Sequence, residues 1–105
     1  MPTTTIAGHE VEVNDEGFLT QPAQWSEELG AELARLIGID PMTDEHWKLI
    51  RFLREDFATQ HETATLRRVS TRLGVGVKDI FKLFPGKPAK KMAYVSGLPK
   101  PKGCV

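Results

Sequence analysis

The spacing of apolar residues predicts five helices after residue 20. The first begins at Pro22, runs to about Ile37 and is ended by Gly38. Its apolar face consists of Trp25, Leu29, Leu33, Leu36 and Ile37. The second follows the N-cap Thr43 and ends near Gln60. Its buried face consists of Trp47, Ile50, Phe52, Leu53 and Phe57.

Three shorter helices are predicted in the rest of the chain. They cover residues 64–73, 77–84 and 88–95, and Gly74 and the Pro85-Gly86 pair separate them. On the fourth helix, the residues expected to face inward are Ile80, Phe81, Leu83 and Phe84. Before the helices, the β-prone runs 3–6 and 9–13 flank Ala7-Gly8 and predict a hairpin, and residues 14–17 predict a turn. The fold class is therefore mainly α, and the hairpin must pack on helices because it is marginal alone.

The last nine residues, 97–105, have a different character from the helical domain 1–96. They read Gly97-Leu98-Pro99-Lys100-Pro101-Lys102-Gly103-Cys104-Val105, and the two prolines and two glycines exclude a helix. Prolines favour the extended polyproline II conformation, in which nine residues span about 25–28 Å. We expect a flexible C-terminal arm, with the single cysteine of the chain one residue from its end.

Composition limits the chemistry that the chain can perform. One cysteine in 105 residues excludes an internal disulfide and a clustered-cysteine zinc site. No histidines have metal-ligand spacing, so we expect neither a metal nor a cofactor. A lone thiol suits a reducing cytosol, and the sequence shows neither a signal peptide nor a membrane span, so we expect a cytoplasmic protein.

Charge is distributed unevenly along the chain. Residues 1–64 carry four basic and thirteen acidic side chains, whereas residues 65–105 carry ten basic and one acidic. A basic C-terminal half favours an anionic or acidic partner. The alternative is that the two halves of the chain neutralise each other on folding.

Cys104 is the candidate reactive group because thiolate is the nucleophilic form of cysteine. Lys100 and Lys102 favour the thiolate, and the carboxylate of Val105 opposes it. Arg67, Lys90 and Lys91 are candidates for binding an anion or the arm itself, and the alternative is that they form a solvated basic face. His46 lies at the start of the second helix, where we expect a structural role, and we assign Trp25 and Trp47 to the core.

Four blocks of the sequence resemble the DsrC/TusE family of sulfur-relay proteins. They are Asp15-Glu16-Gly17-Phe18-Leu19 with Trp25 following, Thr43-Asp44-Glu45-His46-Trp47 followed by Ile50-Arg51-Phe52-Leu53-Arg54, Leu83-Phe84-Pro85 before Pro88-Ala89-Lys90, and the arm 97–105. The resemblance implies a small orthogonal helical bundle with an N-terminal hairpin and a mobile arm. It also implies that Cys104 accepts sulfur as a persulfide and passes it on by transpersulfidation, while residues 97–103 engage a partner.

The resemblance implies partner proteins on both sides of the transfer. The sulfur donors would be complexes like TusBCD or DsrEFH. The acceptor would be a thiouridylase if the pathway is tRNA 2-thiouridine synthesis. In dissimilatory sulfur metabolism the acceptor would be a sulfite reductase or a heterodisulfide-reductase-like complex. Two departures from the family pattern stand out. Ala93 occupies the position of the second cysteine of DsrC-type members. The chain also lacks a short insertion that better-known members carry between the third and fourth helices.

Two other functions fit parts of the sequence. Residues 64–84 have the helix, short glycine turn and helix of a nucleic-acid-binding motif. The basic residues there are Arg67, Arg68, Arg72, Lys78 and Lys82. The helix predicted over residues 77–84, which would be the recognition helix, lacks the base-reading residues Asn and Gln, so we do not expect direct nucleic-acid binding. The other alternative is a non-catalytic adaptor that docks through its arm.

Overall fold

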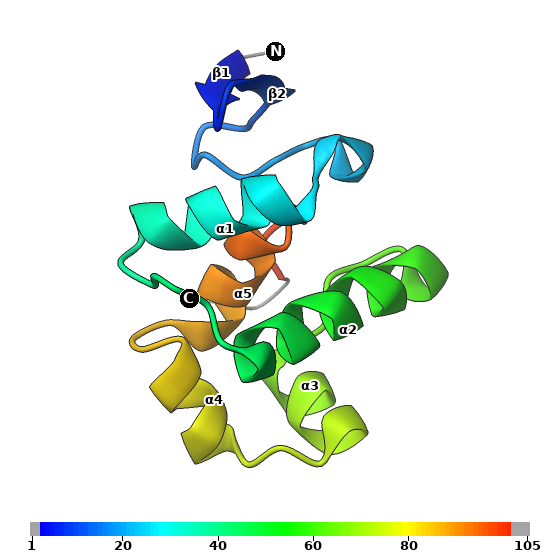
Figure 1. Ribbon diagram of the computed structural model, residues 1–105. Helices are drawn as coiled ribbons and strands as arrows, with labels where there is room; N and C mark the ends of the chain where they lie inside the picture. Colours follow the sequence, from blue (N-terminus) through cyan, green and yellow to red (C-terminus); the bar gives the residue numbers. More distant parts are fainter. Residues whose placement is uncertain (1–2, 102–105) are drawn as a thin grey trace.

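An antiparallel hairpin opens the computed structural model, which describes residues 3–101 (Figure 1). Strand β1 (Thr3–Ile6) pairs with β2 (His9–Glu12) through the predicted turn at Ala7 and Gly8, both of which have positive φ angles. The Asn14 side chain then accepts backbone N–H bonds and forms the predicted turn before the helices begin. The hairpin packs on the first helix, as a marginal two-stranded sheet requires.

Five α-helices follow, in agreement with the number that the sequence predicts. They are α1 (Glu27–Leu36), α2 (Asp44–Gln60), α3 (Leu66–Leu73), α4 (Val77–Leu83) and α5 (Pro88–Val95). Helix α5 contacts α1, α2 and α4, and it occupies the middle of the bundle in Figure 1. Because the arm follows α5 directly, its first residues start from the centre of the molecule.

The predicted helix from Pro22 is wrong in its first turn. Residues Pro22–Gln24 form a short 3₁₀ helix, and Trp25 then adopts an extended conformation with ψ of 147°. Helix α1 starts afresh because Ser26 is its N-cap, and the Ser26 side chain accepts a bond from the Leu29 N–H. The break removes Trp25 from the apolar face of α1 and leaves it free to contact the C-terminal end of α5.

Two groups of buried side chains form the core. One lies among α2 to α5 and includes Leu98, and the other lies between the hairpin and α1. Trp25 and Tyr94 pack against both. Two residues predicted to face inward are exposed instead, Leu36 at 53% and Phe81 at 43%. Leu36 is the last residue of α1, and α4 turns Ile80 rather than Phe81 into the core.

Candidate functional site

The first residues of the predicted arm belong to the folded body. Gly97 ends α5 with φ of +69°, and the Leu98 N–H donates to the carbonyl of Ala93 at 3.1 Å. The Leu98 side chain is 1% exposed and lies in the larger core cluster. The boundary predicted at 96/97 therefore marks the end of α5 but not the end of contact with the body.

Trp25 covers the junction between α5 and the arm. Its indole Nε1 donates to the carbonyl of Val95 at 2.8 Å. The ring lies so close to Gly97 that a Cβ atom there would be 2.5 Å from Trp25 Cδ1. Only glycine fits beneath this ring, which gives position 97 a steric requirement in addition to its positive φ.

Arg54 holds the same junction from α2. Its Nη1 donates to the carbonyl of Ser96 at 2.8 Å, and its Nη2 donates to that of Pro22 at 3.0 Å. The guanidinium also stacks on Trp25, with 4.3 Å between its Cζ atom and the ring centroid. Burial lowers the pKa of Arg54, but an arginine starts so far above neutral pH that the side chain stays charged.

Thr63 fixes the arm further along. Its hydroxyl donates to the carbonyl of Pro99 at 2.7 Å, and Pro101 is buried while Pro99 is exposed. The described part of the arm is thus bound to the body through Pro101. We call Trp25, Arg54 and Thr63 the arm seat. Because the arm is bound in this way, the reach expected for nine free residues does not apply to this arrangement.

A carboxylate from the N-terminal turn pairs with both the arm and α5. The Oε2 atom of Glu16 lies 3.5 Å from Lys100 Nζ and 3.7 Å from Lys90 Nζ. All three side chains are partly exposed, so the two ion pairs are weak and screened by salt. They form an electrostatic contact that a stronger anion could replace.

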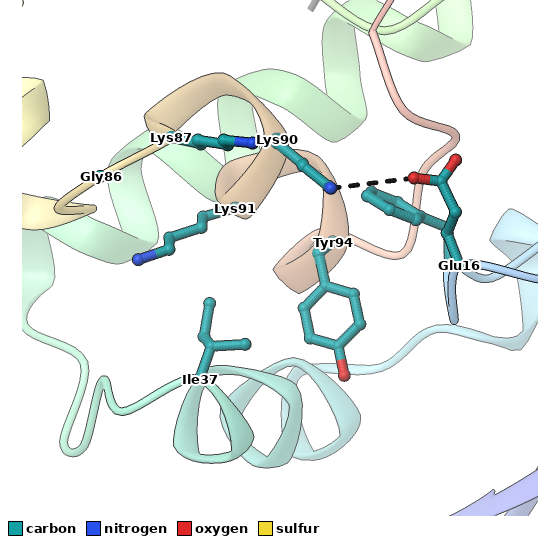
Figure 2. Close-up of a pocket in the computed structure, with 8 residues that line it drawn as sticks. Glu16, Ile37, Gly86, Lys87, Lys90, Lys91 and Tyr94 are labelled. Carbon is teal, nitrogen blue, oxygen red and sulfur yellow. Dashed lines mark ion pairs between the residues drawn. The ribbon is translucent and has the colours of Figure 1, made fainter. Parts of the chain in front are cut away.

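Glu16 and Lys90 are at the edge of a pocket of about 470 Å³ between α5, the end of α1 and the turn at residues 14–17 (Figure 2). Its basic residues are Lys87, Lys90 and Lys91, and its apolar residues are Phe18, Ile37 and Tyr94. Phe18 and Tyr94 pack edge to face with 5.8 Å between ring centroids, and burial raises the pKa of Tyr94. We call this cavity the basic pocket.

The predicted site residues fall into three groups. Gly97, Leu98, Pro99, Lys100 and Pro101 lie at the arm seat or beside it, and Lys90 and Lys91 line the basic pocket. Arg67 is exposed on α3 and belongs neither to the arm seat nor to the basic pocket. Lys102, Gly103 and Cys104 lie outside the described residues.

Other candidate side chains serve the fold. The His46 Nδ1 accepts the Thr43 N–H at 3.0 Å, and its Nε2 lies 2.9 Å from the carbonyl of Leu83, so His46 joins the start of α2 to the end of α4. This confirms its predicted structural role. Arg68 donates to both carboxylate oxygens of the buried Asp56, which raises the pKa of Arg68. That pairing removes one of the five basic side chains considered for nucleic-acid binding.

Sequence reasoning missed the role of the arm seat. From the sequence, Trp25 is expected only as a core residue and Arg54 only as part of a helix. One signal was available for Arg54: it stands among Ile50, Leu53 and Phe57, at the spacing of one helix face, where a charged residue needs a partner. Thr63 and Glu16 gave no such signal.

Residues 3–101 contain neither a metal-binding cluster nor a membrane-spanning helix. Within that range, no three His, Cys, Asp or Glu side chains gather as they would around a metal ion. In the same range, every helix is too short or too polar to cross a membrane.

Comparisons with known proteins agree on one family. The family described as "DsrC like protein" matches residues 5–105. Sulfurtransferase TusE of Escherichia coli strain K12 is 34% identical over 106 aligned residues, covering 93% of this chain and 95% of TusE. One chain of the crystal structure of dissimilatory sulfite reductase I (DsrI) superimposes on this chain with a TM-score of 0.87 at 33% identity. The match covers 99% of this chain and 100% of the DsrI chain.

A further relative bears on the expected insertion. The gamma subunit of the dissimilatory-type sulfite reductase of Nitratidesulfovibrio vulgaris is 32% identical over 105 residues, which cover 100% of both chains. An alignment of this length leaves no room for extra residues in that relative. The lack of an insertion between the third and fourth helices therefore does not distinguish this chain from that relative.

Proposed function

The chain belongs to the family of DsrC-like proteins, and from this premise we propose that it is a sulfur carrier that holds sulfane sulfur as a persulfide on Cys104. The observation that carries the proposal is the extent of the family match, which runs through residue 105 and so includes the cysteine. The names of the relatives, a sulfurtransferase and a sulfite reductase subunit, support a role in a sulfur relay.

The chemistry is transpersulfidation without net oxidation. The Cys104 thiolate attacks the outer sulfur of a donor persulfide, the donor's S–S bond breaks as the new S–S bond to Cys104 forms, and the donor thiolate leaves. An acceptor thiolate then attacks the outer sulfur of the Cys104 persulfide and regenerates the Cys104 thiolate. Each cycle moves one zero-valent sulfur atom.

The residue at position 93 limits the carrier to one thiol. Ala93 is fully buried on α5, and its carbonyl accepts the Leu98 N–H at the start of the arm. Without a second cysteine the chain cannot expel its sulfur by closing an internal disulfide. Release must therefore come from an acceptor molecule, and we propose that a donor protein and an acceptor protein of a sulfur relay are its partners.

Residues of the arm and the basic side chains have distinct roles in this proposal. Residues 97–101 present the end of the arm from a fixed place, and Lys100 and Lys102 favour the anionic forms of the thiol and persulfide. Lys90 supplies positive charge beside Lys100, because both pair with Glu16. Lys91 adds positive charge elsewhere in the basic pocket, and Arg67 would act on a partner from α3. We propose as donor a complex like TusBCD or DsrEFH, and as acceptor a thiouridylase, a sulfite reductase or a heterodisulfide-reductase-like complex.

Intact-mass spectrometry tests the proposal directly. Incubation with glutathione persulfide or a persulfidated donor protein should add one sulfur atom, about 32 Da, which a reductant removes. Cys104→Ser should stay unmodified and keep its free energy of unfolding within about 0.5 kcal/mol of the parent chain. A protein that yields only covalent dimer or unmodified chain with these donors is an adaptor rather than a carrier.

A further inference from the structure

The basic pocket combines two properties that suit one kind of ligand. Phe18, Ile37 and Tyr94 give it an apolar lining, and three lysine side chains stand around them (Figure 2). A small inorganic anion would satisfy the lysines but leave the apolar lining in water. A peptide segment with both carboxylates and apolar side chains satisfies both parts of the pocket.

The charges in the pocket are not balanced within the described chain. Glu16 is the one acidic residue among those that line it, and a single oxygen of Glu16 is shared by Lys90 and Lys100. Lys91 donates to the carbonyl of Pro85, a neutral acceptor. The pocket therefore retains net positive charge, which favours an acidic ligand.

Glu16 also connects the pocket to the arm. Its carboxylate is at once part of the pocket and the ion-pair partner of Lys100, which lies between the seated residues Pro99 and Pro101. An anion that enters the pocket competes with Glu16 for Lys90, and because the same Glu16 oxygen pairs with Lys100, it can reach that lysine as well. Binding at the pocket and the hold on the arm are thus linked through one carboxylate.

We propose that the basic pocket binds an acidic, partly apolar segment of a relay partner protein, whose carboxylate replaces Glu16 at Lys90 and Lys100 and so weakens the hold on the arm. The proposal rests on the carrier function, because it assigns the pocket to a partner in sulfur transfer. It predicts that Glu16 and Lys90 affect binding in opposite directions, although they form an ion pair with each other.

An NMR titration with a defined probe tests this inference. The probe is a blocked synthetic peptide of alternating glutamate and leucine, added to the full ¹⁵N-labelled chain at low ionic strength. The peptide should shift the amide signals of residues around Glu16, Lys90 and Lys100, and added salt should weaken the binding of the peptide. A matched peptide with glutamine in place of glutamate should bind far more weakly.

Two pairs of variants decide whether the pocket is the binding site. Lys90→Gln should weaken peptide binding about two- to five-fold, the range expected for a partly exposed ion pair. Glu16→Gln should strengthen binding by a similar factor, because it removes the competing carboxylate. The controls change the same charges elsewhere: Lys82→Gln on α4 and Glu55→Gln on α2, both exposed, should have little effect.

Several results would overturn the inference. These are weaker or unchanged binding in Glu16→Gln, equal losses of binding in Lys90→Gln and Lys82→Gln, or complete competition by thiosulfate at matched ionic strength, which would indicate a small-anion site.

A separate measurement distinguishes failure of the carrier function from failure of the pocket. Sulfur loading of Cys104 from glutathione persulfide should be unchanged in the control variants Lys82→Gln and Glu55→Gln, and Cys104→Ser should still bind the peptide. Absence of sulfur loading in the parent chain would refute the carrier function. Normal loading of the parent chain without peptide binding would refute only the proposed role of the pocket.

Discussion

Gly97 and Gly74 have nearly the same backbone conformation but different surroundings. Their φ angles are +69° and +66°, yet a Cβ atom at Gly97 would collide with Trp25, whereas one at Gly74 would meet nothing within 4 Å. Gly74→Ala should therefore cost about 1–2 kcal/mol for the left-handed conformation alone. Gly97→Ala should cost about 1–3 kcal/mol more, because the added methyl group overpacks the seat.

Urea unfolding of the two glycine variants measures this difference. The parent chain and both variants need the same m-value for the comparison to hold. Equal losses of stability would mean that Trp25 moves away from Gly97 without cost, and that the contact does not constrain the arm.

Two arginines on α2 allow a matched test of the arm seat. Arg54 stacks on Trp25 and bonds to two carbonyls, and Arg51 lies over Trp47 with 5.7 Å to the centroid and pairs with the exposed Glu27. Lysine lacks the planar fork and cannot bridge two carbonyls in the same geometry. Arg54→Lys should therefore cost about 1–3 kcal/mol through an unpaired carbonyl, and Arg51→Lys less than about 0.5 kcal/mol.

Hydrogen exchange shows whether the effect of Arg54→Lys reaches the arm. The Leu98 amide, which donates to Ala93, should exchange faster in Arg54→Lys and at the parental rate in Arg51→Lys. Parental exchange of Leu98 in Arg54→Lys would show that Arg54 stabilises α2 without positioning the arm.

At the scale of elements, periodicity and capping residues predicted most of the fold. The bounds of α2 and α5 were correct because Thr43 and Pro88 mark their starts and apolar spacing continues through them. The start of α1 was wrong because the apolar spacing of Trp25 and Leu29 suggested continuity, while Ser26 is a stronger start signal. Helix α3 begins two residues later than predicted because Thr65 is its N-cap.

The arm seat could not be predicted in the same way. Its residues come from the break before α1, from α2 and from the loop before α3, and their bonds go to carbonyl groups of the C-terminal segment. A bond from a side chain to a distant carbonyl produces no periodic pattern in the sequence. The resemblance to a known family pointed to Cys104 and the arm, but the contacts that hold residues 97–101 required the structure.

An ion pair between Asp56 and Arg68 joins α2 to α3. The Asp56 side chain is only 6% exposed, and its carboxylate accepts hydrogen bonds from Nε and Nη2 of Arg68. Asp56→Asn therefore removes the negative charge that compensates the Arg68 guanidinium. Glu27→Gln breaks the exposed pair with Arg51 and should change stability by less than about 0.5 kcal/mol. Thermal unfolding should show a clearly lower midpoint for Asp56→Asn alone. Equal midpoints would mean that α3 is held to α2 by apolar packing.

For the whole molecule, the two oppositely charged halves of the sequence compensate each other only in part. The pairs of Glu16 with Lys90 and Lys100, and of Asp56 with Arg68, join the acidic half to the basic half. Other basic residues, among them Arg67, Arg72, Lys78 and Lys82, remain exposed on α3 and α4. The folded chain therefore keeps a separation of charge that attracts acidic surfaces from a distance.

The burial of Pro101 has a consequence for the choice of partner. Cys104 is three residues beyond Pro101 in the sequence, and three residues of chain span no more than about 11 Å. The position of Pro101 therefore limits the reach of the thiol while the seat is occupied. The molecule measures 35 Å along its longest axis. An acceptor cysteine held close to Pro101 experiences the thiol at a high effective concentration, because the tether is short. An acceptor bound to the opposite end of the molecule experiences an effective concentration near zero, however tightly it binds.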